Sequence, residues 1–140
     1  MSENLDLVRS IYADWERGDF SAEDWPDVDI EYRIVGLREL LPQSWRGLTS
    51  ARVGARAVLE VMELRQIVAE EYRELDGGEV LVLDRRVGRF KRSGMQFGTG
   101  TSVRERGFGA HLFHVRDGKV RELVAYFDRD RALADLGREK

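Results

Sequence analysis

The sequence predicts an α+β domain in which helices cover one face of a curved antiparallel sheet. Apolar residues recur at helical spacing near the N-terminus and again in the middle of the chain. Elsewhere apolar and polar residues alternate, as they do in half-buried strands. Turn sequences such as Asp76-Gly77-Gly78-Glu79 separate the alternating runs and indicate hairpins.

The chain is expected to form a single domain over residues 1–140, because 140 residues with 42% hydrophobic content can bury a core. Its 23 basic residues are interspersed with 26 acidic ones and the formal net charge is −3, which argues against a nucleic-acid partner. The chain has no cysteine, which excludes disulfides and thiolate metal sites, and two histidines argue against a histidine-rich metal site. We therefore expect no metal and no cofactor.

The first ten residues, MSENLDLVRS, are acidic and amphipathic, unlike the basic and then apolar start of a signal peptide. No uninterrupted apolar run approaches the length of a membrane span. These features predict a soluble, cytoplasmic protein without a membrane partner.

The first elements in chain order are expected to be two helices and a strand. Residues 3–17 predict a helix with Ser2 as its N-cap and Gly18 at its end. Residues 21–24 predict a second, short helix that ends before a proline. The alternation over residues 28–35 predicts a half-buried strand with its even-numbered residues inward.

A central helix is expected after a loop over residues 36–47. Thr49 or Ser50 would cap this helix. Its inward positions are predicted to include Val53, Ala57, Val58, Val61 and Met62. The period then changes to two, so residues 67–75 and 80–90 predict two strands.

The last third of the chain is expected to complete the sheet. Residues 94–100 form a glycine-rich connection, and residues 101–115 and 120–127 predict the closing strands. Asp128 would then cap a final helix over residues 129–136.

The register of the hairpin at residues 109–128 depends on its turn. A two-residue turn at Asp117-Gly118 would pair His111 with Val124, whereas a three-residue turn with a bulge at Gly118 would pair it with Leu123. We favour the bulge because it places apolar residues together on one face with His111. That face would hold His111, Phe113, Val115, Leu123, Ala125 and Phe127, with Glu122 and Tyr126 on the other.

Four groups of residues, in this order and spacing, carry a family resemblance over almost the whole chain. They are Val8-Arg9 to Trp15-Glu16-Arg17-Gly18-Asp19-Phe20, Pro26-Asp27-Val28-Asp29-Ile30-Glu31-Tyr32, Trp45-Arg46-Gly47, and Phe113 to Val120 with Tyr126-Phe127-Asp128. Together they resemble the SnoaL-like branch of the NTF2-like superfamily. The resemblance implies a cone, in which a curved sheet wraps around the N-terminal and central helices and leaves a pocket, and usually a homodimer formed through the sheet. It implies no single reaction, since the superfamily includes isomerases, cyclases, dehydratases and proteins that only bind.

His111 is the first candidate for catalysis, because a mid-strand imidazole on the concave face could act as acid or base near neutral pH. The ordinary alternative is a half-buried histidine hydrogen-bonded to a neighbour. The resemblance places His111 where ketosteroid isomerases carry a protonated aspartic acid, and Tyr32 where they carry a basic aspartate. A tyrosine, with a reference pKa near ~10, is a poor base. Tyr12 lies one residue from the position of their catalytic tyrosine, which argues against steroid isomerisation.

Asp128 and Arg85 are the other catalytic candidates. The resemblance matches Asp128 to an acid/base aspartate of polyketide cyclases, although the residue also serves as a helix cap. Arg85 could offer a fixed cation to an enolate or carboxylate if its strand face is concave, or could lie in water. The strand alternation places Leu81, Leu83, Arg85 and Val87 on one face and Val80, Val82, Asp84 and Arg86 on the other.

Bulky apolar residues are expected to line the pocket or to fill the core beside it. The predicted pocket residues are Tyr12, Trp15, Trp25, Tyr32, Trp45, Met62, Phe113, Leu123 and Phe127. Trp45 is singled out because an aromatic residue in a loop beside the mouth is less easily explained by packing.

Two functions remain open at this point. The first is a cofactor-free acid/base enzyme, an isomerase, cyclase or lyase acting on a small organic carbon acid, with His111 moving the proton and Arg85 or Tyr32 steadying charge. The second is a non-catalytic ligand-binding or dimerisation module. An enzyme should pair His111 with a carboxylate or tyrosine, whereas a dimerisation module should expose Leu112, Val124 and Tyr126 on the outer sheet face.

Overall fold

The computed structural model describes residues 2–36, 44–98 and 107–137. The helices are α1 (Glu3–Glu16), α2 (Leu48–Val61) and α3 (Arg129–Gly137), with a short 3₁₀ turn at Asp76–Gly78. The strands are β1 (Pro26–Val35), β2 (Ser44–Arg46), β3 (Met62–Glu74), β4 (Glu79–Phe90), β5 (Gln96–Phe97), β6 (Phe108–Arg116) and β7 (Lys119–Tyr126). No helix in these described ranges is both long and apolar enough to cross a membrane.

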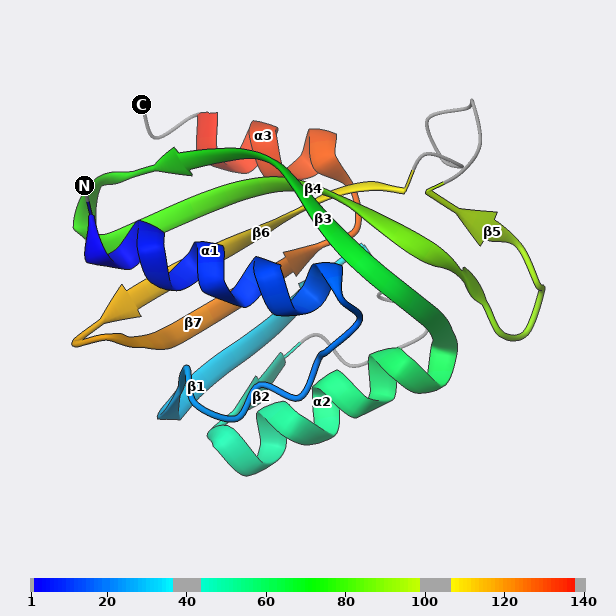
Figure 1. Cartoon of the computed structure of the whole chain (residues 1–140), viewed down its shortest axis with the longest axis horizontal. Coiled ribbons are helices and arrows are strands. Elements are labelled where there is room, and N and C mark those ends of the chain that lie inside the picture. The colour runs from blue at the N-terminus through cyan, green and yellow to red at the C-terminus, as the bar shows by residue number, and fades with distance from the viewer. Residues whose placement is uncertain (1, 37–43, 99–106, 138–140) are drawn as a thin grey trace.

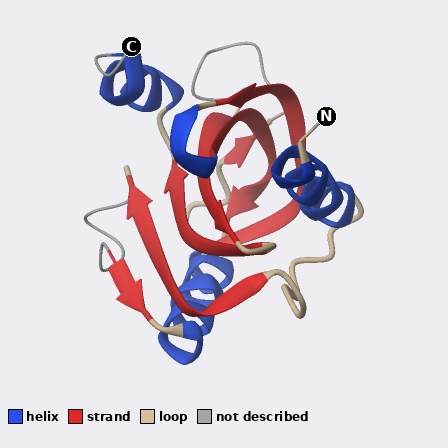
Figure 2. Ribbon diagram, turned by 90° about the vertical axis from the view of Figure 1, so that its left-hand side faces the viewer, coloured by secondary structure: helices blue, strands red, loops and turns tan. Residues whose placement is uncertain are grey.

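The strands form one curved sheet in the order β2-β1-β7-β6-β4-β3, with β5 paired to β4. Helices α1 and α2 lie on the concave side and α3 lies against the other face (Figure 1). Figure 2 shows how strongly the strands of the sheet curl. The α+β class is confirmed, but the sheet is mixed because β1 runs parallel to β7.

Helix α1 forms as its sequence predicts. The Ser2 side chain accepts a hydrogen bond from the Leu5 backbone N–H, which caps the first turn. Its buried residues repeat at helical spacing and include Tyr12 and Trp15, which face the concave side of the sheet. Gly18 follows the helix with a φ of 82°, a conformation that glycine adopts without strain.

The short helix predicted at residues 21–24 is absent, and the segment is irregular. The Ser21 hydroxyl and backbone N–H both bond to Asp19 Oδ1, so the serine closes a turn backward instead of capping a helix. Ala22 has a φ of 53°, which is outside the right-handed helical region. This segment therefore crosses from α1 to β1 as a loop.

Helix α2 and the strands beside it differ from prediction in four details. The helix begins at Leu48 after Gly47 without a side-chain cap, so neither Thr49 nor Ser50 caps it. Val53 is 52% exposed rather than inward, and the helix instead buries small residues such as Gly54. Strand β3 follows α2 without a loop, starting at Met62. The even-numbered residues of β1 are buried from Ile30 onward, but Val28 is 71% exposed.

The hairpin of β6 and β7 has neither of the two predicted registers. Asp117 and Gly118 both have positive φ, as in a two-residue hairpin turn, and Arg116 pairs with Lys119. A bulge then occurs at Arg121, so that His111 pairs with Ala125. The predicted faces are nevertheless correct, because Phe113, Val115, Leu123 and Ala125 lie in the concave core.

The outer face of the sheet is covered within the chain. Leu112, Val124 and Tyr126 are buried together with Ala132 and Leu136 of α3. The exposed apolar surface expected of a dimerisation module is therefore not formed by those three sheet residues. The predicted strand at 101–115 begins at Phe108 where it is described, and residues 101–106 lie outside the described ranges.

Candidate active site

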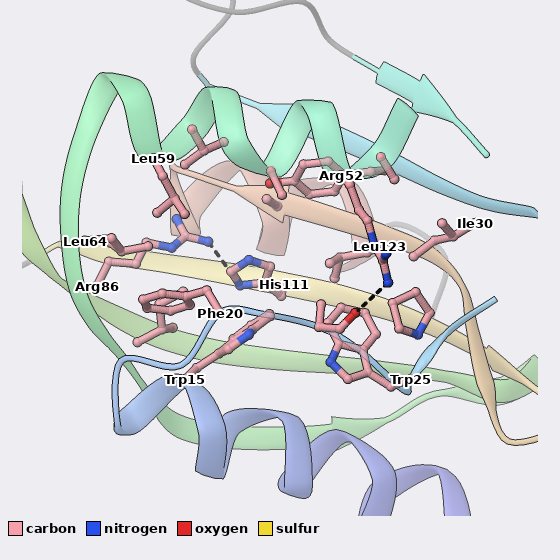
Figure 3. A pocket seen from close by; sticks show the side chains of 18 of the residues that line it. Trp15, Phe20, Trp25, Ile30, Arg52, Leu59, Leu64, Arg86, His111 and Leu123 are labelled. Carbon is pink, nitrogen blue, oxygen red and sulfur yellow. Dashed lines mark hydrogen bonds between the residues drawn. The ribbon is translucent and has the colours of Figure 1, made fainter. Parts of the chain in front are cut away.

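A cavity of about 120 Å³ lies between α2, the concave face of the sheet and the loop that follows α1. One buried water needs roughly 10 to 15 Å³ measured in this way, so the cavity can hold several waters or a small organic group. Its walls are largely aromatic and aliphatic, with Trp15, Phe20 and Trp25 on one side and α2 on the other (Figure 3). His111 projects from β6 into this space.

Four polar side chains form a buried cluster at the wall of the cavity: Tyr12, Asp84, Arg86 and His111. The Tyr12 hydroxyl donates a hydrogen bond of 2.6 Å to Asp84 Oδ2. His111 Nδ1 lies 2.6 Å from the same oxygen. Asp84 is fully buried and His111 is 5% exposed, so these contacts are shielded from water. We call these four residues the polar cluster.

Arg86 is fixed behind His111 by several groups. Its guanidinium donates to the backbone carbonyl of Tyr126 and, at 3.0 Å, to that of Ala110. Its Cζ atom lies 4.3 Å from the centre of the Phe127 ring. Its Nε lies 3.6 Å from Asp84 Oδ1, an oxygen for which the described residues provide no hydrogen-bond partner.

The register of the sheet brings the polar cluster together. Val82 of β4 pairs with His111 of β6, which places Asp84 two residues further along the same face, opposite Gly109. The guanidinium of Arg86 occupies the space that a side chain at Gly109 would fill, since an added Cβ would lie 2.2 Å from its Nη1. A glycine at this position of β6 is therefore what admits the buried arginine.

The cluster favours an ionised Asp84 and a neutral His111. Burial raises the pKa of Asp84, but the Arg86 charge and hydrogen bonds from His111 and Tyr12 outweigh it, so the pKa lies below 3.8. Burial lowers the pKa of His111 below 6.5, and Arg86 lowers it further, while Asp84 opposes the shift. His111 Nδ1 lies 2.6 Å from the Asp84 carboxylate, which can only accept, and 3.2 Å from Arg86 Nη2, which can only donate (Figure 3). We assign the proton to Nδ1 because the contact with the carboxylate is the shorter one, and the neutral ring then carries its lone pair on Nε2. His111 can therefore act as a base near neutral pH.

The low pKa of His111 predicts how stability depends on pH. As the pH falls below 6.5, the unfolded chain binds a proton at this histidine before the folded chain does. The free energy of unfolding is expected to decrease by about 1 kcal/mol between pH 7 and pH 5.5. Urea unfolding at both pH values measures this change, which should be smaller in His111→Gln. An equal change in both proteins would contradict the assignment.

The cavity brings together part of the predicted set of site residues. His111, Trp15, Trp25, Tyr32, Leu123 and Phe127 all line it. Tyr12, Met62 and Phe113 are core residues instead, each at most 1% exposed. Trp45 also lies outside the lining: its ring stacks on Tyr32 at 5.6 Å and covers Gly54, so packing explains it.

Arg85 and Asp128 lie away from the cavity lining. Arg85 is on the outer face of β4 and donates to the Gly98 carbonyl at 2.9 Å. It was expected to reach the pocket only if its strand face were concave, and that face is the outer one. Asp128 Oδ1 accepts from the backbone N–H of Asp130 at 3.0 Å, as a cap of α3. Arg86 lines the cavity and Asp84 lies behind its wall against His111, although neither was predicted as a site residue. Their signal in the sequence was two charged residues on the same strand face as Val80 and Val82.

The described residues contain no group of three or more histidine or acidic side chains placed to hold a metal ion. A neutral imidazole can take a proton, and Tyr32 can donate a hydrogen bond because burial raises its pKa to about 12.

Several solved structures share this arrangement of elements. An NTF2-like protein of unknown function from Burkholderia pseudomallei is 20% identical with a TM-score of 0.73, over 96% of this chain and 97% of that one. TerC, crystallised with polyporic acid, is 22% identical with a TM-score of 0.70, over 96% and 98%. A candidate SnoaL-like polyketide cyclase from Mesorhizobium loti is 18% identical with a TM-score of 0.67, over 90% and 99%.

These likenesses define the class of protein by its fold, which is NTF2-like, also described as cystatin-like. Within that class, the similar structures include several named as SnoaL-like or polyketide cyclases, so the resemblance seen in the motifs is confirmed at the level of the fold. No protein-family model and no curated protein sequence matches the chain. The chain thus combines an NTF2-like fold with a cavity and a buried polar cluster at its wall.

Proposed function

We propose that this protein is a cofactor-free acid/base enzyme that acts on a small organic carbon acid. The observation that carries the proposal is the contact of 2.6 Å between His111 Nδ1 and the buried Asp84 carboxylate. This contact fixes the tautomer and the orientation of the imidazole and leaves Nε2 as the base. A histidine that only filled the core would not need a buried, ionised partner, whose desolvation is unfavourable.

The proposed step is removal of a proton from carbon. Nε2 of His111 takes the proton from a carbon beside a carbonyl, and the electron pair moves to the carbonyl oxygen to give an enolate. Arg86 and the Tyr32 hydroxyl, which both line the cavity, stabilise the developing negative charge. The proton then returns to another carbon in an isomerase or to a leaving group in a lyase. In a cyclase the enolate carbon attacks a second carbonyl, and the new alkoxide takes the proton.

Deuterium exchange tests this step without knowledge of the natural substrate. The protein is incubated with 2-tetralone in D2O, and loss of the signals of its α-protons is followed by proton NMR. The wild type is expected to exceed the rate of free imidazole at the same concentration. The variant His111→Gln is expected to lose about 100-fold or more of that rate, the usual contribution of a general base.

The matched control is His114→Gln, because His114 is the other histidine and pairs with Glu122 on the opposite face of the sheet. It is expected to exchange as the wild type does. Thermal melting of each variant separates loss of activity from loss of fold. A wild-type rate no higher than that of imidazole, or one unaffected by His111→Gln, would refute the proposal.

A non-catalytic ligand-binding module is the second candidate, favoured by the mainly apolar wall of the cavity. Saturable binding of 2-tetralone without exchange would support it. A homodimer is proposed for either function, and sedimentation velocity tests it directly. A dimerisation role alone would be favoured by a stable dimer that binds no small molecule.

A further inference from the structure

The charged side chains that line the cavity are all basic. Arg52 and Arg86 contribute to its surface together with the imidazole of His111, and no aspartate or glutamate does so in the described residues. The chain as a whole carries a net charge of −3, so this is the reverse of the overall balance. Asp84 lies behind the lining, where it neutralises Arg86.

Arg52 differs from Arg86 because its charge is not matched. It extends from α2 and donates a long hydrogen bond of 3.4 Å to the Ala22 carbonyl. No ion pair joins it to an acidic side chain in the part of the chain that the structure describes. A guanidinium has five N–H donors, so one long bond leaves most of its capacity for a ligand.

The two arginines approach the cavity from different sides. Arg52 reaches from α2 toward Trp25, whereas Arg86 lies beside His111, which packs on Trp15 with ring centres 4.9 Å apart (Figure 3). Between them the surface consists of aromatic and aliphatic side chains. A ligand that satisfies this arrangement has a flat apolar body, a polar group at His111 and a negative charge at the end near Arg52.

We propose that the ligand of this cavity is an aromatic or cyclic organic anion, and that Arg52 binds its acidic group at the side of the cavity opposite His111. This proposal rests on the proposed function only in placing the reacting carbon at His111. The preference for an anion concerns binding and does not depend on catalysis. It agrees with the crystallisation of one structural neighbour, TerC, with an organic acid.

A pair of probes with nearly the same shape and different charge tests the proposal. Binding of trans-cinnamate and of neutral cinnamamide is measured by isothermal titration calorimetry at pH 8, where the carboxylate is ionised. The wild type is expected to bind cinnamate at least about tenfold more tightly. High salt is expected to weaken the binding of cinnamate and to leave that of cinnamamide unchanged.

The variant Arg52→Gln is expected to weaken cinnamate binding by about five- to tenfold and to change cinnamamide binding less than about twofold. Arg56→Gln is the matched control, because Arg56 is exposed on the same helix, does not line the cavity and changes the net charge equally. It is expected to bind both probes as the wild type does.

Equal affinity for both probes, equal losses of both in Arg52→Gln, or no binding of either would overturn the proposal. The result is separable from the test of catalysis. A charge preference without deuterium exchange would refute the reaction and leave the ligand class standing. Exchange without a charge preference would refute the ligand class alone.

Discussion

Replacement of Asp84 by asparagine is expected to lower the free energy of unfolding by about 3 to 5 kcal/mol. The carboxylate is the counter-charge of Arg86, whose side chain is 4% exposed. Asparagine preserves the shape of the residue and removes the charge, which leaves a cation buried without compensation. Urea unfolding at pH 7 measures the effect.

Two further variants make this result specific. Asp128→Asn is the same chemical change at an exposed helix cap and is expected to reduce stability by less than about 1 kcal/mol. Adding Arg86→Met to Asp84→Asn removes both charges and is expected to recover much of the loss, as replacement of a buried ion pair by apolar groups often does. A loss in Asp84→Asn no larger than that in Asp128→Asn would show that the pair is not buried and ionised.

Substitution of Gly109 by alanine is expected to destabilise the protein by about 3 kcal/mol, the upper end of the usual effect of overpacking. The new methyl carbon would lie 2.2 Å from Arg86 Nη1 and 2.7 Å from the Tyr126 carbonyl oxygen. The guanidinium cannot move aside freely, because it is bonded to the carbonyls of Ala110 and Tyr126. Chemical denaturation measures the loss.

A double-mutant cycle isolates the contact of Gly109 with Arg86. In the Arg86→Met background, Gly109→Ala is expected to be less harmful because the charged, bonded group is gone. Gly94→Ala is the control for loss of a glycine, since its added methyl would contact nothing and its φ of 74° alone is expected to cost about 1 kcal/mol. An unchanged effect of Gly109→Ala in the Arg86→Met background would exclude the arginine as the cause.

The elements were predictable because local periodicity and turn residues specify them. The helix at α1 with its Ser2 cap and the alternation of β4 follow directly from the sequence. The prediction of a short helix at 21–24 was wrong because Ser21 bonds to the preceding Asp19 instead of capping the residues that follow it. Both arrangements are locally possible, and only the fold decides which occurs. The assignment of Trp45 to the pocket lining was wrong for a similar reason: the residue on which it packs, Gly54, is on a different element.

The candidate site was predicted less completely, because it depends on contacts between distant strands. The alternation placed Asp84 and Arg86 on one face correctly, but the choice of Arg85 required knowing which face is concave. Two charges on the inward face of a strand are unfavourable unless paired, and their partners, His111 and Tyr12, are 27 and 72 residues away from Asp84. The contact with His111 follows from strand order and that with Tyr12 from the packing of α1 on the sheet, and no local pattern specifies either.

The bulge at Arg121 controls which side chains of β7 face the cavity. In a regular hairpin continued from the same turn, Glu122 would lie opposite Phe113, and opposed residues of antiparallel strands share a face. A carboxylate would then stand beside the imidazole, where it would repel an anion and favour the protonated ring. The extra residue instead directs Leu123 and Ala125 inward and leaves Glu122 near Arg33 on the far face. The absence of a carboxylate from the described lining of the cavity thus depends on a strand irregularity as well as on the residue types of β7.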